Sequence, residues 1–111
     1  MSPKTRPTRI KVSFTLDSFL YHGIVMISKL LQKEQRQIIN EALIEYLKNP
    51  LDKYYTKNSH RYKKVLKVDV HVIESIQSLA RQRNVPTSII VRTALALYIA
   101  KRAKELGIEA V

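Results

Sequence analysis

The chain repeats itself once, without a gap, at an offset of 52 residues, so that residues 9–47 align with residues 61–99. Identical residues recur along this alignment at Arg9/Arg61, Lys11/Lys63, Asp17/Asp69, Ala42/Ala94, Leu43/Leu95 and Tyr46/Tyr98. Apolar positions also coincide, both in segments with the period of a strand and in segments with the period of a helix. Such a repeat constrains the fold, because both copies are expected to form the same supersecondary unit. One copy of roughly 40 residues buries too little surface to be stable alone, so we expect one compact domain.

Each copy is predicted to contain one strand followed by two helices. Arg9 to Leu16 alternates between apolar and polar residues, which is typical of a half-buried strand. Asp17 and Asp69 offer N-caps for the helices that follow the strands, and Asn84 suits a left-handed turn. Gly23 inside a helix is expected to be a local weakness of about 1 kcal/mol. The expected elements are a strand over 9–16, helices over 18–33 and 36–48, a strand from residue 61, and helices to residue 83 and over 88–106.

The two strands are expected to pair with each other, because a lone strand leaves both hydrogen-bonding edges bare. The pairing also gathers their polar residues on one outward face. The predicted fold class is therefore mainly α with a two-stranded antiparallel ribbon, in the order β-α-α-linker-β-α-α. The predicted organisation is a flexible basic arm at 1–8, a first repeat at 9–49, a linker at 50–60 and a second repeat at 61–107.

The chain is strongly basic, since 20 Lys and Arg against 9 Asp and Glu give a formal net charge of +11. Such an excess predicts a polyanionic partner, either nucleic acid or an anionic membrane surface, although solubility alone also explains it. Residues 1–16 and 53–68 are basic without any acidic residue, and they include both predicted strands. This distribution favours nucleic acid, because a membrane-surface helix carries its charge along one helical face.

Composition also limits the compartment and the chemistry. The chain has no cysteine for disulfides or zinc–thiolate sites, and no apolar stretch reaches the roughly 18 residues of a membrane span. The basic N-terminus with two prolines is not typical of a signal peptide, so we expect the protein in the cytoplasm. His22, His60 and His71 lie on different segments without metal-ligand spacing, and there is no glycine-rich phosphate loop. We therefore expect no enzyme, no metal and no cofactor.

The order of a strand, a capped helix, a tight turn and a second helix resembles the ribbon-helix-helix family, the group of the Arc and methionine repressors. The motifs are Arg9-Ile-Lys-Val-Ser-Phe-Thr-Leu-Asp17 and Val85-Pro-Thr-Ser-Ile-Ile-Val-Arg-Thr-Ala-Leu-Ala-Leu-Tyr98. In that family two copies intertwine, their paired strands enter the DNA major groove, and the N-termini of the second helices hold phosphates. The tandem form is similar to TraY-like plasmid-transfer proteins and some small regulators of archaeal viruses and plasmids. The resemblance implies a DNA-associated protein, in the host cytoplasm if the source is viral.

The resemblance also implies that outward strand side chains contact base edges. Lysine donates to guanine O6 and N7, and hydroxyl groups both donate and accept. Val65 departs from the polar pattern of the family, and it either contacts a thymine methyl or contributes nothing specific. Alternatively, these residues are only the wet face of an ordinary hairpin. The predicted base-contacting residues are Arg9, Lys11, Ser13, Thr15, Lys63, Val65 and Lys67.

Phosphate contacts are predicted at the starts of the second helices. Thr87 and Ser88 place hydroxyls beside free backbone amides and the positive end of the helix dipole, although plain N-capping would use the same hydroxyls. The first copy has no Ser or Thr there, so its contact would depend on Arg36 and the amides. The basic arm either follows the DNA backbone or contacts nothing. The predicted phosphate-contacting residues are Arg36, Gln37, Thr87, Ser88, Arg6 and Arg61.

Each copy carries a surplus apolar patch at positions where the other copy is polar. The four residues are Val25 and Met26 in the first copy and Leu97 and Ala100 in the second. We predict that these patches are contact surfaces between chains. If unlike patches meet, chains form an open array along DNA, and if like patches meet, they form a closed dimer that reads two half-sites. Alternatively, the linker or the C-terminal tail covers both patches.

The predicted function is a sequence-specific double-stranded DNA-binding transcriptional regulator, a repressor that acts on its own promoter or on others. One alternative is an architectural DNA-coating protein with weak sequence preference. Another is an antitoxin-like protein-interaction module that binds its partner through the surplus apolar patches. A specificity ratio over random DNA separates the first two, because both depend on salt but only the regulator discriminates strongly between sequences.

Overall fold

The computed structural model describes residues 9–55 and 61–107, and the side chains of residues 9, 14, 61–64, 66 and 67 lie outside this description. Within these ranges the chain is mainly helical with a two-stranded antiparallel sheet, which confirms the predicted fold class at this level. Each element of the second half begins 52 residues after its counterpart in the first half. The elements are β1 (Arg9–Asp17), α1 (Ser18–Leu31), α2 (Gln35–Lys48), β2 (Arg61–Asp69), α3 (Val70–Arg83) and α4 (Thr87–Glu105).

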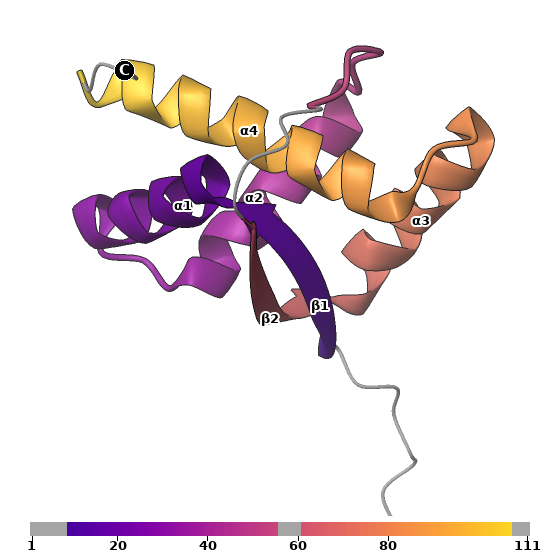
Figure 1. Ribbon diagram of the computed structural model, residues 1–111, viewed down its shortest axis with the longest axis horizontal. Helices are drawn as coiled ribbons and strands as arrows, with labels where there is room; N and C mark the ends of the chain where they lie inside the picture. Colours follow the sequence, from indigo (N-terminus) through magenta and orange to yellow (C-terminus); the bar gives the residue numbers. More distant parts are fainter. Residues whose placement is uncertain (1–8, 56–60, 108–111) are drawn as a thin grey trace, which may run out of the picture.

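The sheet joins the two halves of the chain. β1 and β2 run antiparallel, and the register extends from Arg9 opposite Asp69 to Asp17 opposite Arg61. Its central pair is Ser13 with Val65, two residues that the sequence alignment also matches. In Figure 1 the two strands extend downward from the middle of the helices, α1 and α3 lie at opposite sides, and α2 and α4 cross between them. The ribbon therefore has one face toward the helices and one face away from them.

Both predicted helix caps are present. The Leu20 amide donates to Asp17 Oδ1 at 2.9 Å, and the His71 amide donates to Asp69 Oδ1 at 2.9 Å. Because Asp69 is the N-cap, the second strand ends at this residue and α3 begins at Val70. Asn84 follows α3 with φ 57°, which confirms the predicted left-handed turn.

The first helix ends at Leu31, two residues earlier than expected. Gln32 adopts φ 55° and ψ 43°, and its amide donates to the carbonyl oxygens of Lys29 and Ser28. A residue with a Cβ atom pays roughly 1 kcal/mol or more for this conformation, so the residue type gave no signal of it. The turn between the two helices sets the conformation, as it does for Asn84 in the second half.

The core lies between the helices and the inner face of the ribbon. Leu16 of β1 and Val68 of β2 are fully buried there. The largest buried helical side chains are Leu20, Ile24, Ile27, Ile38, Ile39, Leu43, Ile73, Ile76, Ile90 and Leu95. In α3, Val70, Ile73 and Ile76 are buried and form one continuous stripe with Ala80, whereas Val72 is only partly buried. Leu31, Leu47 and Leu79 are likewise partly buried at the edge of the core.

Gly23 allows α1 and α4 to approach closely. A Cβ atom placed at this position would lie 2.8 Å from Ile99 Cδ1 and 2.9 Å from Ile99 Cγ2. These distances are shorter than van der Waals contact, so alanine would force the isoleucine or the helix to move. Gly23 therefore has a packing role besides its expected cost in helix propensity, because the absent side chain makes room for α4.

The segment after α2 is held against the second half of the chain. The carbonyl oxygen of Leu51 accepts hydrogen bonds from the Tyr46 hydroxyl at 2.7 Å and from Arg83 Nη1 at 2.6 Å. The amide of Tyr55 donates to Thr93 Oγ1 at 2.9 Å. The polar linker predicted at 50–60 thus begins with an anchored stretch, and residues 56–60 lie outside the described part of the chain.

Candidate nucleic-acid interface

The outer face of the ribbon carries a row of exposed side chains. Lys11, Ser13 and Thr15 of β1 are exposed, as the alternation of the sequence predicts. Val65 of β2, opposite Ser13, is 60% exposed. Backbone pairing and the core beneath hold these residues at fixed spacing, with Leu16 buried on the other face. This face offers an amine, two hydroxyls and one apolar group to whatever enters contact with it.

The remaining predicted base-contacting residues, together with Arg61 and Arg6, are placed only through the backbone or not at all. In the register, Lys67 lies opposite Lys11 and Lys63 lies opposite Thr15. Arg9 and Arg61 begin the two strands, and the side chains of these four basic residues lie outside the described part. Arg6 and the basic arm at 1–8 also lie outside it. Their contacts stay predictions.

Two matched polar residues support the ribbon from the second helices. Asn40 of α2 accepts the Asp69 amide on Oδ1 at 3.1 Å, and Arg92 of α4 donates from Nη1 to the Thr15 carbonyl oxygen at 3.3 Å. Arg92 is 9% exposed. Neither residue was predicted, although each is a polar residue that directly follows a run of apolar residues at the same position of a second helix. That interruption is the signal that could have identified them.

The linker holds the end of β1 from the side. Asp17 is 1% exposed, and its Oδ2 accepts a hydrogen bond from the Tyr55 hydroxyl while its Oδ1 caps α1. Burial, followed by the hydrogen bond to Asp17, raises the pKa of the Tyr55 hydroxyl. The hydroxyl therefore remains a proton donor throughout the physiological pH range. The contacts of Asp17 with Tyr55 and of the Thr15 carbonyl oxygen with Arg92 therefore fix this end of the ribbon.

The start of α2 is closed by its own side chains. Glu34 and Gln37 form a capping box, in which the Glu34 amide donates to Gln37 Oε1 at 3.0 Å. Arg36 donates from Nε to the Glu34 carboxylate. Both residues predicted to contact phosphate here, Arg36 and Gln37, are thus engaged within the chain. A phosphate at this site would have to replace or share the Glu34 contact.

The start of α4, unlike that of α2, has no side-chain cap among the described residues. Its N-cap is Pro86. The expected capping by Thr87 and Ser88 was therefore wrong, because Thr87 is already the first helical residue and lies past the N-cap position. The amides of Ile89 and Ile90 bond to the Pro86 carbonyl oxygen. An open hollow of about 410 Å³ adjoins this end, lined by Ala80, Arg81, Asn84, Val85, Pro86 and Thr87.

The predicted self-association residues lie on two separate helices. On α1, Met26 is 38% exposed and Val25 is half-buried. On α4, Leu97 is 40% exposed and Ala100 is exposed. The surplus patches are thus at least partly open to solvent, and within the described residues neither the linker nor the C-terminal segment buries Met26 or Leu97 completely.

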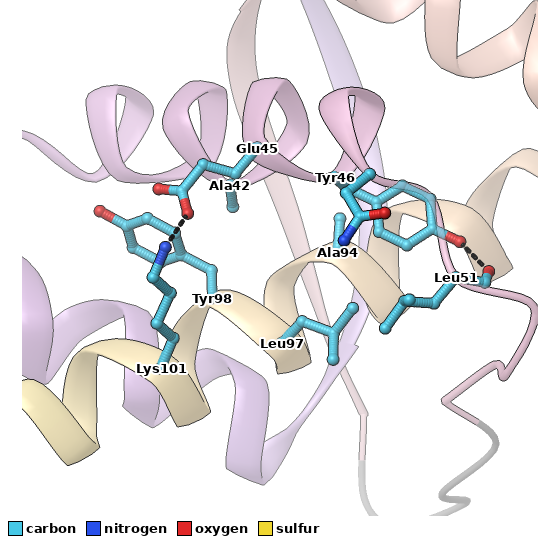
Figure 2. Close-up of a pocket in the computed structure, with 9 residues that line it drawn as sticks. Ala42, Glu45, Tyr46, Leu51, Ala94, Leu97, Tyr98 and Lys101 are labelled. Carbon is cyan, nitrogen blue, oxygen red and sulfur yellow. Dashed lines mark hydrogen bonds and ion pairs between the residues drawn. The ribbon is translucent and has the colours of Figure 1, made fainter.

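Leu97 also lies in a groove between α2 and α4. Figure 2 shows Leu97 and Ala94 of α4 between the side chains of Tyr46 and Tyr98, the matched tyrosines of the two halves. The groove has a volume of about 330 Å³. An ion pair of 3.0 Å between Lys101 Nζ and Glu45 Oε1 bounds it on one side. Both tyrosines are buried.

Two searches of the described residues returned nothing: no group of three or more His, Cys, Asp or Glu that could hold a metal, and no helix long and apolar enough to cross a membrane. Comparisons with protein-family models, curated proteins and solved structures returned no match to this chain.

Proposed function

We propose that this chain is a sequence-specific double-stranded DNA-binding transcriptional regulator, a repressor that inserts its ribbon into the major groove. The observation that carries the proposal is the exposed row of Lys11, Ser13 and Thr15 on a two-stranded ribbon that is backed by a packed core. A two-stranded ribbon fits the major groove, where every base pair presents a distinct pattern of donors and acceptors. The net charge of +11 supplies the attraction to the phosphate backbone.

The proposal includes a tandem ribbon-helix-helix pseudo-dimer within one chain. Two facts support it: the central pair of the ribbon joins the matched residues Ser13 and Val65, and every element recurs after 52 residues. A two-fold axis through that pair would relate the halves. Asn40 and Arg92, at matched positions, brace the ribbon from α2 and α4, which such an axis would also exchange.

Within this proposal the start of α4 is the stronger phosphate site. No side chain within the described residues caps Thr87 and Ser88, so their backbone amides and the helix dipole are available to an anion. At α2 the Glu34 carboxylate already occupies the corresponding place and repels a phosphate. The two halves would therefore hold the DNA backbone unequally.

Titration of the full chain onto duplex DNA tests the proposal. The target is the promoter immediately upstream of its coding region, with random DNA as competitor and at two salt concentrations. We expect binding at least about a thousandfold tighter than to random DNA. The variant Lys11→Ala/Ser13→Ala/Thr15→Ala should lose roughly a hundredfold in affinity for the site, because it removes three base-facing groups. Lys104→Ala, which removes the same charge from the end of α4, is the matched control.

The other outcomes separate the rival functions. Equal affinity for both DNAs, with a steep loss in salt, indicates an architectural coating protein. No binding at low salt contradicts a DNA function and directs the search to a protein partner, as for an antitoxin-like module. An unchanged affinity of the triple variant would show that the outer face of the ribbon does not read bases.

Chains are further proposed to contact one another through Met26 and Leu97, whose side chains remain well exposed. Leu97 matches Glu45 of the first half, so Leu97→Glu gives both halves the same residue type there. We expect this variant to lower the cooperativity of DNA binding and the molecular mass of the complex in sedimentation. Ser75→Glu, on an exposed site of α3, controls for the added charge. Unchanged cooperativity and mass would contradict the proposed self-association.

A further inference from the structure

The register of the ribbon makes its two ends chemically different. The central cross-strand pair is Ser13 with Val65. The flanking pairs are Lys11 with Lys67 at one end and Thr15 with Lys63 at the other. One end therefore carries two lysines, whereas the other carries one lysine and one threonine.

An apolar side chain stands at the centre of an otherwise polar surface. Val65 is 60% exposed, the largest exposed fraction among the exposed large apolar side chains of the described residues. Ser13, directly opposite, is exposed and presents a hydroxyl. Covering an apolar group is favourable, and the apolar group that the major groove offers is the C5 methyl of thymine.

We infer that the ribbon reads a non-palindromic DNA site in which a thymine methyl packs against Val65. The inference rests on the proposed function. A two-fold axis through the central pair would map Ser13 onto Val65 and Thr15 onto Lys67, so the two halves of the site must differ at the central pair and in one residue of each flanking pair. Lys11 and Lys63 match, as do Arg9 and Arg61 at the strand starts, and the two lysines take the same base pair, a guanine contact, in each half. The end with Lys11 and Lys67 covers the more guanine-rich half.

Selection of sites by the full chain from a random duplex library tests the symmetry. The wild type is expected to enrich one non-palindromic motif within the span of a single ribbon. The variant Val65→Ser/Lys67→Thr gives both strands the same Lys, Ser and Thr at matched register positions, so its motif should become palindromic. A palindromic motif from the wild type would overturn the inference and leave the proposed function intact. If no motif is enriched, the inference and the proposed function both fail.

Deoxyuridine in place of the selected thymine tests Val65 directly, because it removes only the methyl group. We expect the wild type to lose about fourfold in affinity, the effect of exposing one buried methyl-sized group. Val65→Ser should bind both duplexes equally, and Lys11→Ala should keep the fourfold difference. Circular dichroism checks that the variants are folded. The assignment of thymine to Val65 would be overturned if the wild type bound the thymine and deoxyuridine duplexes equally. It would also be overturned if Val65→Ser kept the same difference in affinity as the wild type.

Discussion

Asp17 and Asp69 occupy matched positions and make the same helix cap, yet their surroundings differ. Asp17 is 1% exposed and also accepts a hydrogen bond from Tyr55. Asp69 is half-buried, and its cap to His71 is exposed. The same local signal therefore has one role in the second half and two in the first, because the segment after α2 reaches only one end of the ribbon.

The starts of α2 and α4 differ in the same way. Glu34 closes α2 with a capping box, whereas α4 begins after Pro86 without a side-chain cap among the described residues. A repeat that keeps its fold can therefore change the chemistry of each copy separately. We expect the first half to contribute more to stability and the second half more to anion binding.

Asp17→Ala tests this comparison most severely. We expect the free energy of unfolding to fall by about 2–4 kcal/mol, because the variant loses a helix cap and leaves the Tyr55 hydroxyl without its acceptor. Asp69→Ala is the matched control and should cost about 1 kcal/mol or less. Urea denaturation followed by circular dichroism measures both. Equal losses would show that the burial of Asp17 adds nothing to the cap.

Tyr55→Phe isolates the contact from the linker. We expect a loss of about 1–2 kcal/mol in the free energy of unfolding, since a buried carboxylate oxygen loses its donor. Tyr54→Phe is the control, because the Tyr54 hydroxyl lies 3.5 Å from Arg83 Nη1, at the limit of a hydrogen bond. In the Asp17→Ala background the effect of Tyr55→Phe should shrink. If it stays the same size, the hydrogen bond between these residues is not its cause.

Gly23→Ala compares the packing of α1 with that of α3. The clash with Ile99 is expected to cost more than the gain in helix propensity, for a net loss of about 1 kcal/mol in thermal or urea unfolding. Ser75→Ala, at the matched and exposed position of α3, should be neutral or slightly stabilising. The loss should disappear in an Ile99→Ala background. A stabilised Gly23→Ala variant would disprove the close approach of α1 and α4.

The smallest effect on the free energy of unfolding is expected from the titration of Glu41. Thr93, the matched residue of the second half, has no carboxylate to titrate. Burial would raise the pKa of Glu41, but hydrogen bonds from Lys33 and Tyr98, with the nearby charge of Arg102, lower it below the ordinary value of 4.5. The ionised form therefore stabilises the fold. This contribution is complete above the ordinary pKa and disappears as the pH falls through the lowered value.

The corresponding experiment measures the free energy of unfolding between about pH 6 and pH 3. Glu41→Gln should show a slightly shallower decline with acid than the wild type, because this side chain is about one-third exposed and solvent screens its contacts. Glu74→Gln, at an exposed site of α3, is the control. A steeper decline in Glu41→Gln would contradict the lowered pKa.

Local signals in the sequence predicted most of the fold. The alternation from Arg9 to Leu16, the caps at Asp17 and Asp69 and the turn at Asn84 all depend on residues within a few positions of one another. The exposure of Lys11, Ser13 and Thr15 follows from the same alternation. The capping expected of Thr87 and Ser88 failed, because a boundary shifted by one residue changes which group faces the free amides.

The contacts that distinguish the halves could not be predicted, because each joins residues far apart in the sequence. Gly23 meets Ile99, and Tyr55 meets Asp17 and Thr93, only after the helices have packed. No periodicity or capping rule encodes such a distance. The exposed residues of the candidate interface were thus predictable from the sequence. The contacts of Asn40, Arg92 and Tyr55 that support the ribbon were not.

The sequence by itself determined the repeated order of strand and helices and the polar face of the first strand, because these depend on local periodicity. Only the tertiary structure decided that Ser13 lies opposite Val65, that Arg92 braces the ribbon, and that the start of α4 lacks a side-chain cap among the described residues. The physical reason is that register, burial and capping depend on which distant residues the packed core brings together.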